Sequence, residues 1–266
     1  MNTLESLESR RLMTSTLNTD TGLLSIETTD ADDNVIVWQP VPEIMRVEEN
    51  GGVTDYETAH VKRIYIDVKG GNDLVILGRR TVDSEIHGGD GDDSLSAGRG
   101  NDSIYGGTGA DYMFGGDGDD YLDGGTGGAA LDAGDDIFGG TGIDTIDYSA
   151  RTANLKICIG YVANDGEVGE NDNLHADIEI AYGGSGNDRM VNWGPGRVEL
   201  HGRGGDDHLI GGALDDILDG GDGIDELEGA GGFDSYIAKD GQPDVIIAGN
   251  GLNAMDHDAF DDVRVS

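Results

Sequence analysis

Cysteine and long apolar stretches are almost absent from this chain of 266 residues. The one cysteine, Cys158, excludes an intramolecular disulfide and a thiolate metal cluster. It lies in the alternating segment LKICIG, so we expect either a small buried residue or an exposed one without a role. No run of about 18 apolar residues occurs, and the N-terminus lacks the apolar run of a secretory signal. We therefore expect no membrane span.

Basic residues are scarce. Lys and Arg number 16 against 54 Asp and Glu, which gives a formal net charge of −38. Without a basic stripe the chain is not expected to bind nucleic acid, and anionic membranes should repel it unless calcium bridges the two. Such a chain repels itself and should be expanded unless cations are bound. An acidic disordered protein is one alternative, but the regular apolar spacing described below argues against it.

Bulky core residues are also few. With 47 glycines and 6% aromatics, any core must be a thin row of aliphatic side chains repeated along an axis.

Motifs of common catalytic sites are missing as well. The six histidines, at 60, 87, 175, 201, 208 and 257, are never four residues apart, so the zinc-protease motif H-E-x-x-H is absent. The G-x-S-x-G turn of lipases is absent too. We expect no enzyme, although a calcium-dependent carbohydrate-active enzyme of the lyase or epimerase type, or its substrate-binding module, remains the alternative.

What the sequence does contain is a period of nine residues. Residues 88 to 132 divide without remainder into GGDGDDSLS, AGRGNDSIY, GGTGADYMF, GGDGDDYLD and GGTGGAALD. The glycines of each line predict a tight turn, and the last three residues predict a short strand with its apolar eighth residue inward. The first four lines place an aspartate at the sixth position. Backbone carbonyls and a carboxylate offer only oxygen ligands, which favours a hard cation and calcium above all.

The unit resembles G-G-x-G-x-D-x-U-x, the nonapeptide of RTX proteins, also called hemolysin-type calcium-binding repeats. The resemblance implies an all-β fold, a parallel β-roll in which two units form one coil, with β caps at both ends. It also implies that calcium lies between stacked turns, that each aspartate is shared between two ions, and that turn carbonyls complete the ligand shell. The segment LESRRLM, residues 7–13, weakly resembles the LEPR-x-LL motif of large bacterial surface proteins.

The repeats divide the chain into two arrays. We expect a leader or disordered end over 1–16, an N-terminal β cap with degenerate repeats over 17–87, a first array over 88–147, a connector over 148–182, a second array over 183–237 and a C-terminal cap over 238–266. Ala129 and Val198 stand where an aspartate is expected, which puts those two sites in doubt. The predicted calcium ligands are Asp73, Asp93, Asp102, Asp111, Asp120, Asp135, Asp144, Asp188, Asp207, Asp216, Asp225 and Asp234.

The connector holds an acidic loop with Asp165, Glu167, Glu170 and Asp172. Its spacing does not fit an EF-hand, and a solvated loop is the expected reading, ahead of an additional ion site.

Together these features predict a secreted or cell-surface module, structural or adhesive, that folds when it binds several Ca²⁺ ions. About six to ten ions are expected, at sites in the weak extracellular range near 10⁻⁴ to 10⁻³ M. Calcium is the expected partner, with polysaccharide or other cell-surface components as possible further ones.

Overall fold

The structure, a computed structural model, describes residues 14–78, 82–125, 134–160, 164–249, 253–259 and 261–265. Within these ranges the chain forms β-strands and one short 3₁₀ helix, Thr58–His60. The segment LESRRLM and the predicted gap at Ala129 lie outside them. The same ranges contain no helix long and apolar enough to cross a membrane.

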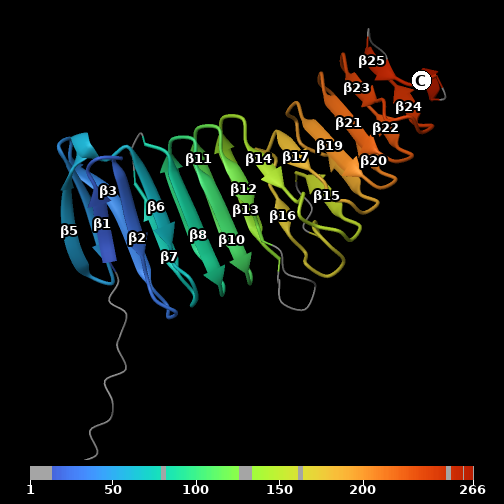
Figure 1. Ribbon diagram of the computed structural model, residues 1–266. Helices are drawn as coiled ribbons and strands as arrows, with labels where there is room; N and C mark the ends of the chain where they lie inside the picture. Colours follow the sequence, from blue (N-terminus) through green and yellow to red (C-terminus); the bar gives the residue numbers. More distant parts are fainter. Residues whose placement is uncertain are drawn as a thin grey trace, which may run out of the picture.

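One wall of the molecule is a 12-stranded sheet (Figure 1). Its strands, in spatial order, are β1 (Thr14–Asn18), β2 (Leu23–Glu27), β6 (Arg63–Asp67), β8 (Ser84–Asp90), β10 (Ser103–Thr108), β12 (Tyr121–Asp123), β14 (Thr145–Asp147), β17 (Ile180–Tyr182), β19 (Glu199–Gly204), β21 (Ile217–Asp222), β23 (Ser235–Ala238) and β25 (Ala254–His257).

Two smaller sheets share the opposite wall. The 8-stranded sheet has the order β16 (Asn173–Leu174), β13 (Asp136–Thr141), β11 (Tyr112–Asp117), β9 (Ser94–Arg99), β7 (Leu74–Leu77), β3 (Asn34–Val41), β4 (Ile44–Glu49) and β5 (Gly52–Glu57). The 6-stranded sheet has the order β15 (Lys156–Ile159), β18 (Arg189–Asn192), β20 (His208–Ile210), β22 (Glu226–Glu228), β24 (Val245–Ala248) and β26 (Asp262–Val265).

Through the arrays the chain alternates between the two walls, one strand per nonapeptide. Strands of successive coils pair in parallel; Ile104, for example, pairs with Ile86 on one side and with Leu122 on the other. Because those partners are 18 residues away, two nonapeptides make one coil. The fold is the predicted all-β parallel β-roll.

The N-terminal strands close one end of the roll. Within the predicted N-terminal β cap, β2, β3 and β6 continue the walls of the roll. β1 pairs antiparallel with β2, and β4 and β5 continue antiparallel from β3, so hairpins cover the sheet edges of the first coil. The outermost strands at this end are therefore β1 and β5. At the other end, β25 and β26 are the last strands of their sheets.

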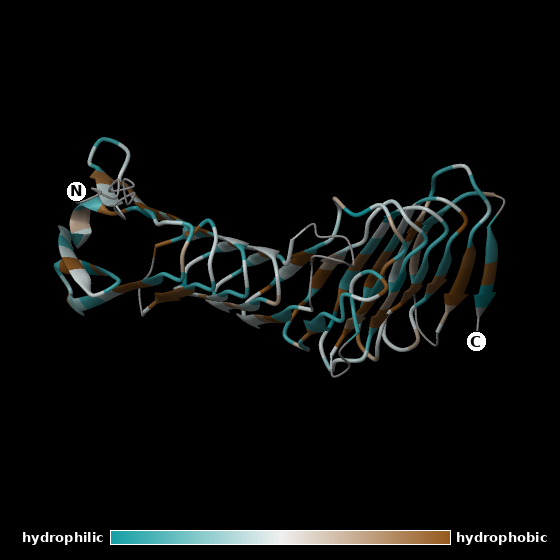
Figure 2. Cartoon of the chain, turned by 90° about the horizontal axis from the view of Figure 1, so that it is seen from below, coloured by the Kyte–Doolittle hydropathy of each residue, from teal (hydrophilic) through white to brown (hydrophobic). Residues whose placement is uncertain are grey.

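The core is the thin aliphatic row that the composition predicts. Figure 2 shows apolar colour on the strands and polar or neutral colour along many of the turns. The described residues at the eighth position of the repeats have no exposed surface: Val75, Ile86, Leu95, Ile104, Met113, Leu122, Ile137, Ile146, Met190, Leu200, Leu209, Leu218, Leu227 and Tyr236. Cys158 is buried as well.

The connector is part of the roll, and its acidic loop is not solvated as expected. β15 begins the 6-stranded sheet and β16 ends the 8-stranded one. Asp165, Glu170 and Asp172 are each only 1% exposed. The prediction was wrong because the loop's charges find partners that the local sequence does not reveal: Glu170 pairs with the Arg151 guanidinium, and Asp172 accepts a hydrogen bond from the Tyr148 hydroxyl.

Candidate metal centre

The aspartates of the sixth position stack along the roll into buried ladders. In each rung, the backbone N–H of one aspartate donates to Oδ1 of the aspartate one coil further on; the bond from Asp93 to Asp111 is 2.8 Å long and that from Asp102 to Asp120 is 2.9 Å. In the repeats, the position of each aspartate is fixed from both sides. Turn glycines precede it, and the apolar side chain two residues after it, at the eighth position, must enter the core.

The ladders follow the two sides of the roll. We call turns that leave the 12-stranded sheet outgoing turns and turns that lead back to it return turns. The outgoing side carries Asp33, Asp73, Asp93, Asp111, Asp135 and Asp172 and then Asp188, Asp207, Asp225, Asp244 and Asp261. The return side carries Ser84, Asp102, Asp120, Asp144 and Glu179 and then, after a break, Val198, Asp216, Asp234 and Asn253.

The second carboxylate oxygen of many rungs is buried and accepts no hydrogen bond from any described residue. This holds for Oδ2 of Asp73, Asp93, Asp120, Asp144, Asp207, Asp225 and Asp244. A buried carboxylate oxygen without a donor is unfavourable by several kcal/mol unless a cation or proton compensates for it. These oxygens are therefore the strongest structural indication of a bound cation.

The surrounding backbone supplies further oxygens at the same places. A Cβ built on Gly88 would lie 2.5 Å from Oδ2 of Asp93 and would also overlap the carbonyl oxygen of Gly106, one coil on. Gly107 has a φ of +119°, and a Cβ there would overlap the carbonyl oxygen of Gly89. Only glycine leaves the carbonyls and the carboxylate facing each other in this way.

Side chains alone do not complete a site. Among the described residues, nowhere do three or more His, Cys, Asp or Glu side chains converge so that they could hold a metal ion. Any ion in the ladder must take most of its ligands from turn carbonyls, which suits calcium because it accepts backbone oxygens in a flexible shell.

A family model for the RTX calcium-binding nonapeptide repeat, present in 4 copies, matches residues 96–128 and 196–236. The chain carries RTX calcium-binding repeats. RTX repeats bind Ca²⁺ in general and are typical of secreted proteins. No curated protein matches the chain closely enough to count as a relative.

The structure distinguishes between the predicted ligands of the RTX repeats. Asp102, Asp111 and Asp135 lie in the ladders like their neighbours. In Asp188 and Asp216, by contrast, Oδ2 accepts the backbone N–H of Gly184 and Gly212, and Oδ2 of Asp234 accepts the Tyr236 hydroxyl at 3.4 Å. Oδ2 of Asp188, Asp216 and Asp234 thus already has a donor within the protein. These three oxygens are weaker candidates for an ion than Oδ2 of Asp207 or Asp225.

Val198 marks a real break in the return ladder. Its side chain is buried, and its N–H donates to Oδ1 of Asp216, but it offers no carboxylate to the preceding coil.

Sequence reasoning missed the rungs whose turns lack the G-G-x-G pattern of the repeat. Asp33, Asp172, Asp244 and Asp261 occupy ladder positions, and the signal they share is an aspartate followed two residues later by an inward apolar residue, as in Asp244-Val-Ile246.

A second, exposed ladder at the fifth position was also missed. Oδ1 of Asn101, for example, accepts the N–H of Asp119, and Oδ1 of Asp119 accepts the N–H of Ile143. The recurring Asp or Asn directly before the sixth-place aspartate is its signal in the sequence.

Burial gives the ladder carboxyls unusual proton affinities. Desolvation, assisted by neighbouring carboxylates, raises the pKa of Asp120 and Asp144 to about 7, of Asp225 to about 7 and of Asp207 to about 8. In the N-terminal part, burial raises the pKa of Asp93 to about 6. Without a cation, these groups hold protons at pH values where an exposed aspartate is ionised.

The metal-free roll should therefore be more stable in mild acid than at neutral pH. A raised carboxyl pKa contributes stability that is complete below the unfolded value near 3.8 and is lost as pH rises through about 6 to 8. In a calcium chelator, circular dichroism should show more β-structure at pH 5.5 than at pH 8, with light scattering as the control for aggregation near the pI of about 4.1. Equal β content at the two pH values would contradict the buried state of these carboxyls.

Proposed function

We propose that this chain is a structural or adhesive module that acts outside the cell and folds when it binds several calcium ions. The observation that carries the proposal is the row of buried oxygens without a hydrogen bond, on Asp73, Asp93, Asp120, Asp144, Asp207 and Asp225. A thin core beside a column of ionised carboxylates does not offset the entropy of ordering the backbone, so the fold needs the positive charge and the coordination that calcium supplies when bound.

An extracellular location follows from the expected affinity. Calcium sites of extracellular modules have dissociation constants of about 10⁻⁴ to 10⁻³ M, whereas cytosolic sensors bind more tightly. Sites in the weak range would remain unfilled inside a cell and fill outside it. The chain would then be exported unfolded and fold after export. Its partner would be a cell-surface component or a polysaccharide.

We assign the module no catalytic role. A carbohydrate-active enzyme needs a broad face for its substrate, but the array strands of the 12-stranded sheet from β8 to β23 are only 3 to 7 residues long. The proposal therefore rests on calcium-dependent structure alone.

Calorimetric calcium titration of matched variants tests the proposal. Asp225→Asn alters a rung whose Oδ2 has no donor, and Asp216→Asn alters a rung whose Oδ2 accepts the Gly212 N–H. We expect wild-type binding of several ions near 10⁻⁴ to 10⁻³ M, fewer ions in Asp225→Asn, and an unchanged number in Asp216→Asn. Submicromolar affinity would argue against folding outside the cell, and equal losses in both variants would show that the free oxygens do not mark the ions.

A further inference from the structure

On the return side, four large apolar side chains point to solvent. The exposed fractions are 56% for Ile143, 62% for Trp193, 47% for Leu214 and 61% for Phe233. We call these four residues the apolar edge. They come from turns that end at Asp144, Val198, Asp216 and Asp234, and Glu179 is the rung between the first two. At a strand spacing of about 4.8 Å, the five rungs span roughly 19 Å.

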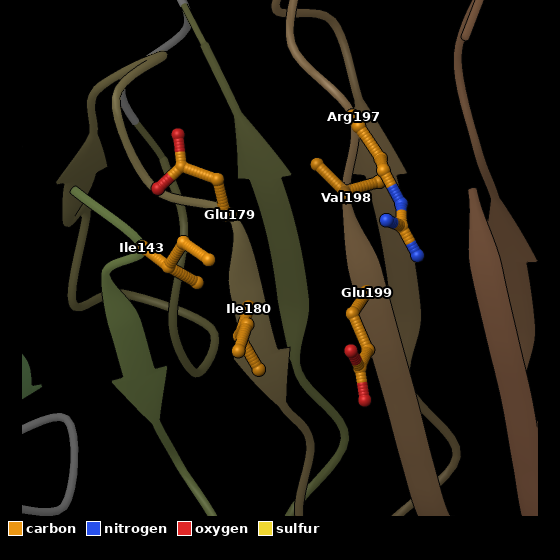
Figure 3. Close-up of a pocket in the computed structure, with 6 residues that line it drawn as sticks. All are labelled: Ile143, Glu179, Ile180, Arg197, Val198 and Glu199. Atoms are coloured by element: carbon orange, nitrogen blue, oxygen red, sulfur yellow. The ribbon is translucent and has the colours of Figure 1, made fainter. Parts of the chain in front are cut away.

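A cavity of about 230 Å³ opens beside the apolar edge, where the return ladder is broken. Ile143, Glu179 and Ile180 lie on one side of it and Arg197, Val198 and Glu199 on the other (Figure 3). Three aliphatic side chains thus form the walls, and two carboxylates lie at the rim. The volume is below that of pockets for drug-sized ligands and matches a single large side chain.

Oδ2 of Asp144, beside Ile143, accepts no hydrogen bond from any described residue and remains a candidate for calcium, but calcium does not account for the rest of this surface. Oδ2 of Asp216 and Asp234 already accepts hydrogen bonds from protein groups, and Val198 has no carboxylate. The carboxylates of Glu179, Glu199 and the exposed Asp215 lie on this side, and Oε2 of Glu179 accepts the Asp144 N–H. The nearby basic groups are the guanidinium of Arg197 and the imidazole of His201, which pairs with Glu199.

Electrostatics limits what can dock here. With about ten Ca²⁺ ions bound, each carrying two positive charges, the formal net charge of −38 would still be about −18, so a second copy of the chain or an anionic surface is repelled. A cationic segment is attracted, and an apolar side chain beside its positive charges would cover the cavity walls. Trp is among the residues that dominate binding energy at interfaces, and Phe is enriched in them, so exposed Trp193 and Phe233 favour a binding surface.

We propose that the apolar edge and its cavity bind a cationic polypeptide segment, which inserts one apolar side chain between Ile143 and Val198 and places Lys or Arg against Glu179 and Glu199. This names the partner class for the adhesive role and rests on the roll being folded with calcium. Binding should weaken as salt is added, because the rim carboxylates of Glu179 and Glu199 are only partly buried.

The test is fluorescence anisotropy in millimolar calcium with a short labelled peptide that carries one phenylalanine among lysines. Ile143→Ser and Phe233→Ser should each weaken binding by about tenfold, whereas Ile224→Ser should leave it unchanged. Ile224 is the matched control because it is 49% exposed at the same repeat position but lies on the outgoing side. All three side chains are exposed, so these variants should retain the fold, and circular dichroism checks this.

Several results would overturn the proposal. The proposal fails if wild type and both edge variants bind the peptide equally, or if Ile224→Ser weakens binding as much as they do. It also fails if a peptide with glutamate in place of lysine binds equally well, or if dextran displaces the lysine peptide. Self-association of the wild type that the edge variants abolish would make the surface an interface between copies instead. A chain that stays unfolded in calcium would refute the proposed function, and circular dichroism reports that outcome separately from peptide binding.

Discussion

Removing calcium with a chelator at pH 8 should abolish most of the β-structure of the roll, and adding calcium back in excess should restore it. Adjacent rungs are one strand spacing apart, about 4.8 Å, and two like charges at that distance repel by about 3 kcal/mol in a partly buried environment. The net stability of a folded domain is only about 5 to 15 kcal/mol. A few ionised rungs without cations are therefore enough to unfold the arrays.

Far-ultraviolet circular dichroism during a calcium titration measures this change. Magnesium is the control, because its strict octahedral geometry and reluctance to lose water suit irregular turn carbonyls poorly. Magnesium at the same concentration should restore much less structure. An identical spectrum in chelator and in calcium would show that the ladder carboxyls do not depend on a cation.

The N-terminal cap should respond least to the chelator. Asp33 begins the outgoing ladder, but its carboxylate accepts hydrogen bonds from Thr29 and Asn50, and these lower its pKa although burial acts in the opposite direction. The carboxylate of the first rung, Asp33, therefore has its hydrogen-bond donors within the protein and does not require a cation. The loss of structure should be concentrated in the arrays, where Oδ2 of Asp93, Asp120, Asp144, Asp207 and Asp225 accepts no hydrogen bond from any described residue.

The regular part of this fold is predictable because one nine-residue pattern fixes three things at once. The glycines permit the tight turn, and the apolar residue at the eighth position points into the core. The aspartate at the sixth position of the repeat then lies in the ladder. Leu95 and Asp93 illustrate this, since both are buried as the pattern predicts.

What the pattern does not determine is the partner of each second carboxylate oxygen. Asp188 and Asp207 follow similar turns, GGSGND and GRGGDD, yet Oδ2 of Asp188 accepts the Gly184 N–H and Oδ2 of Asp207 has no hydrogen bond. The difference depends on the backbone path of the first turn after the connector. The burial of the connector's acidic loop was equally hidden, because Arg151 and Glu170 are 19 residues apart and meet only when β15 and β16 are in place.

Arg151 gives the connector a cation that belongs to the protein. Its guanidinium is 3% exposed, pairs with the fully buried carboxylate of Glu170, lies 3.9 Å from that of Glu167 and is 5.7 Å from the centre of the Tyr148 ring. This pair neutralises charge at the junction of the two smaller sheets as calcium is proposed to do in the arrays.

Replacing Arg151 by methionine should therefore destabilise the roll by about 3 to 5 kcal/mol, because it leaves the Glu170 carboxylate buried without a cation. Urea unfolding in saturating calcium measures the loss. Arg46→Met is the control: Arg46 forms a bidentate, partly exposed pair with Asp55, and removing it should cost much less than removing the buried pair of Arg151.

Two further measurements separate the loss of the cation from the loss of packing. The double variant Arg151→Met with Glu170→Leu should recover part of the stability, since it removes the uncompensated charge along with its former partner. Raising calcium beyond saturation should not rescue Arg151→Met, because the missing charge belongs to the chain rather than to a ladder site. A deficit no larger than that of Arg46→Met, or one that additional calcium corrects, would mean that the connector is held by the same ions as the arrays.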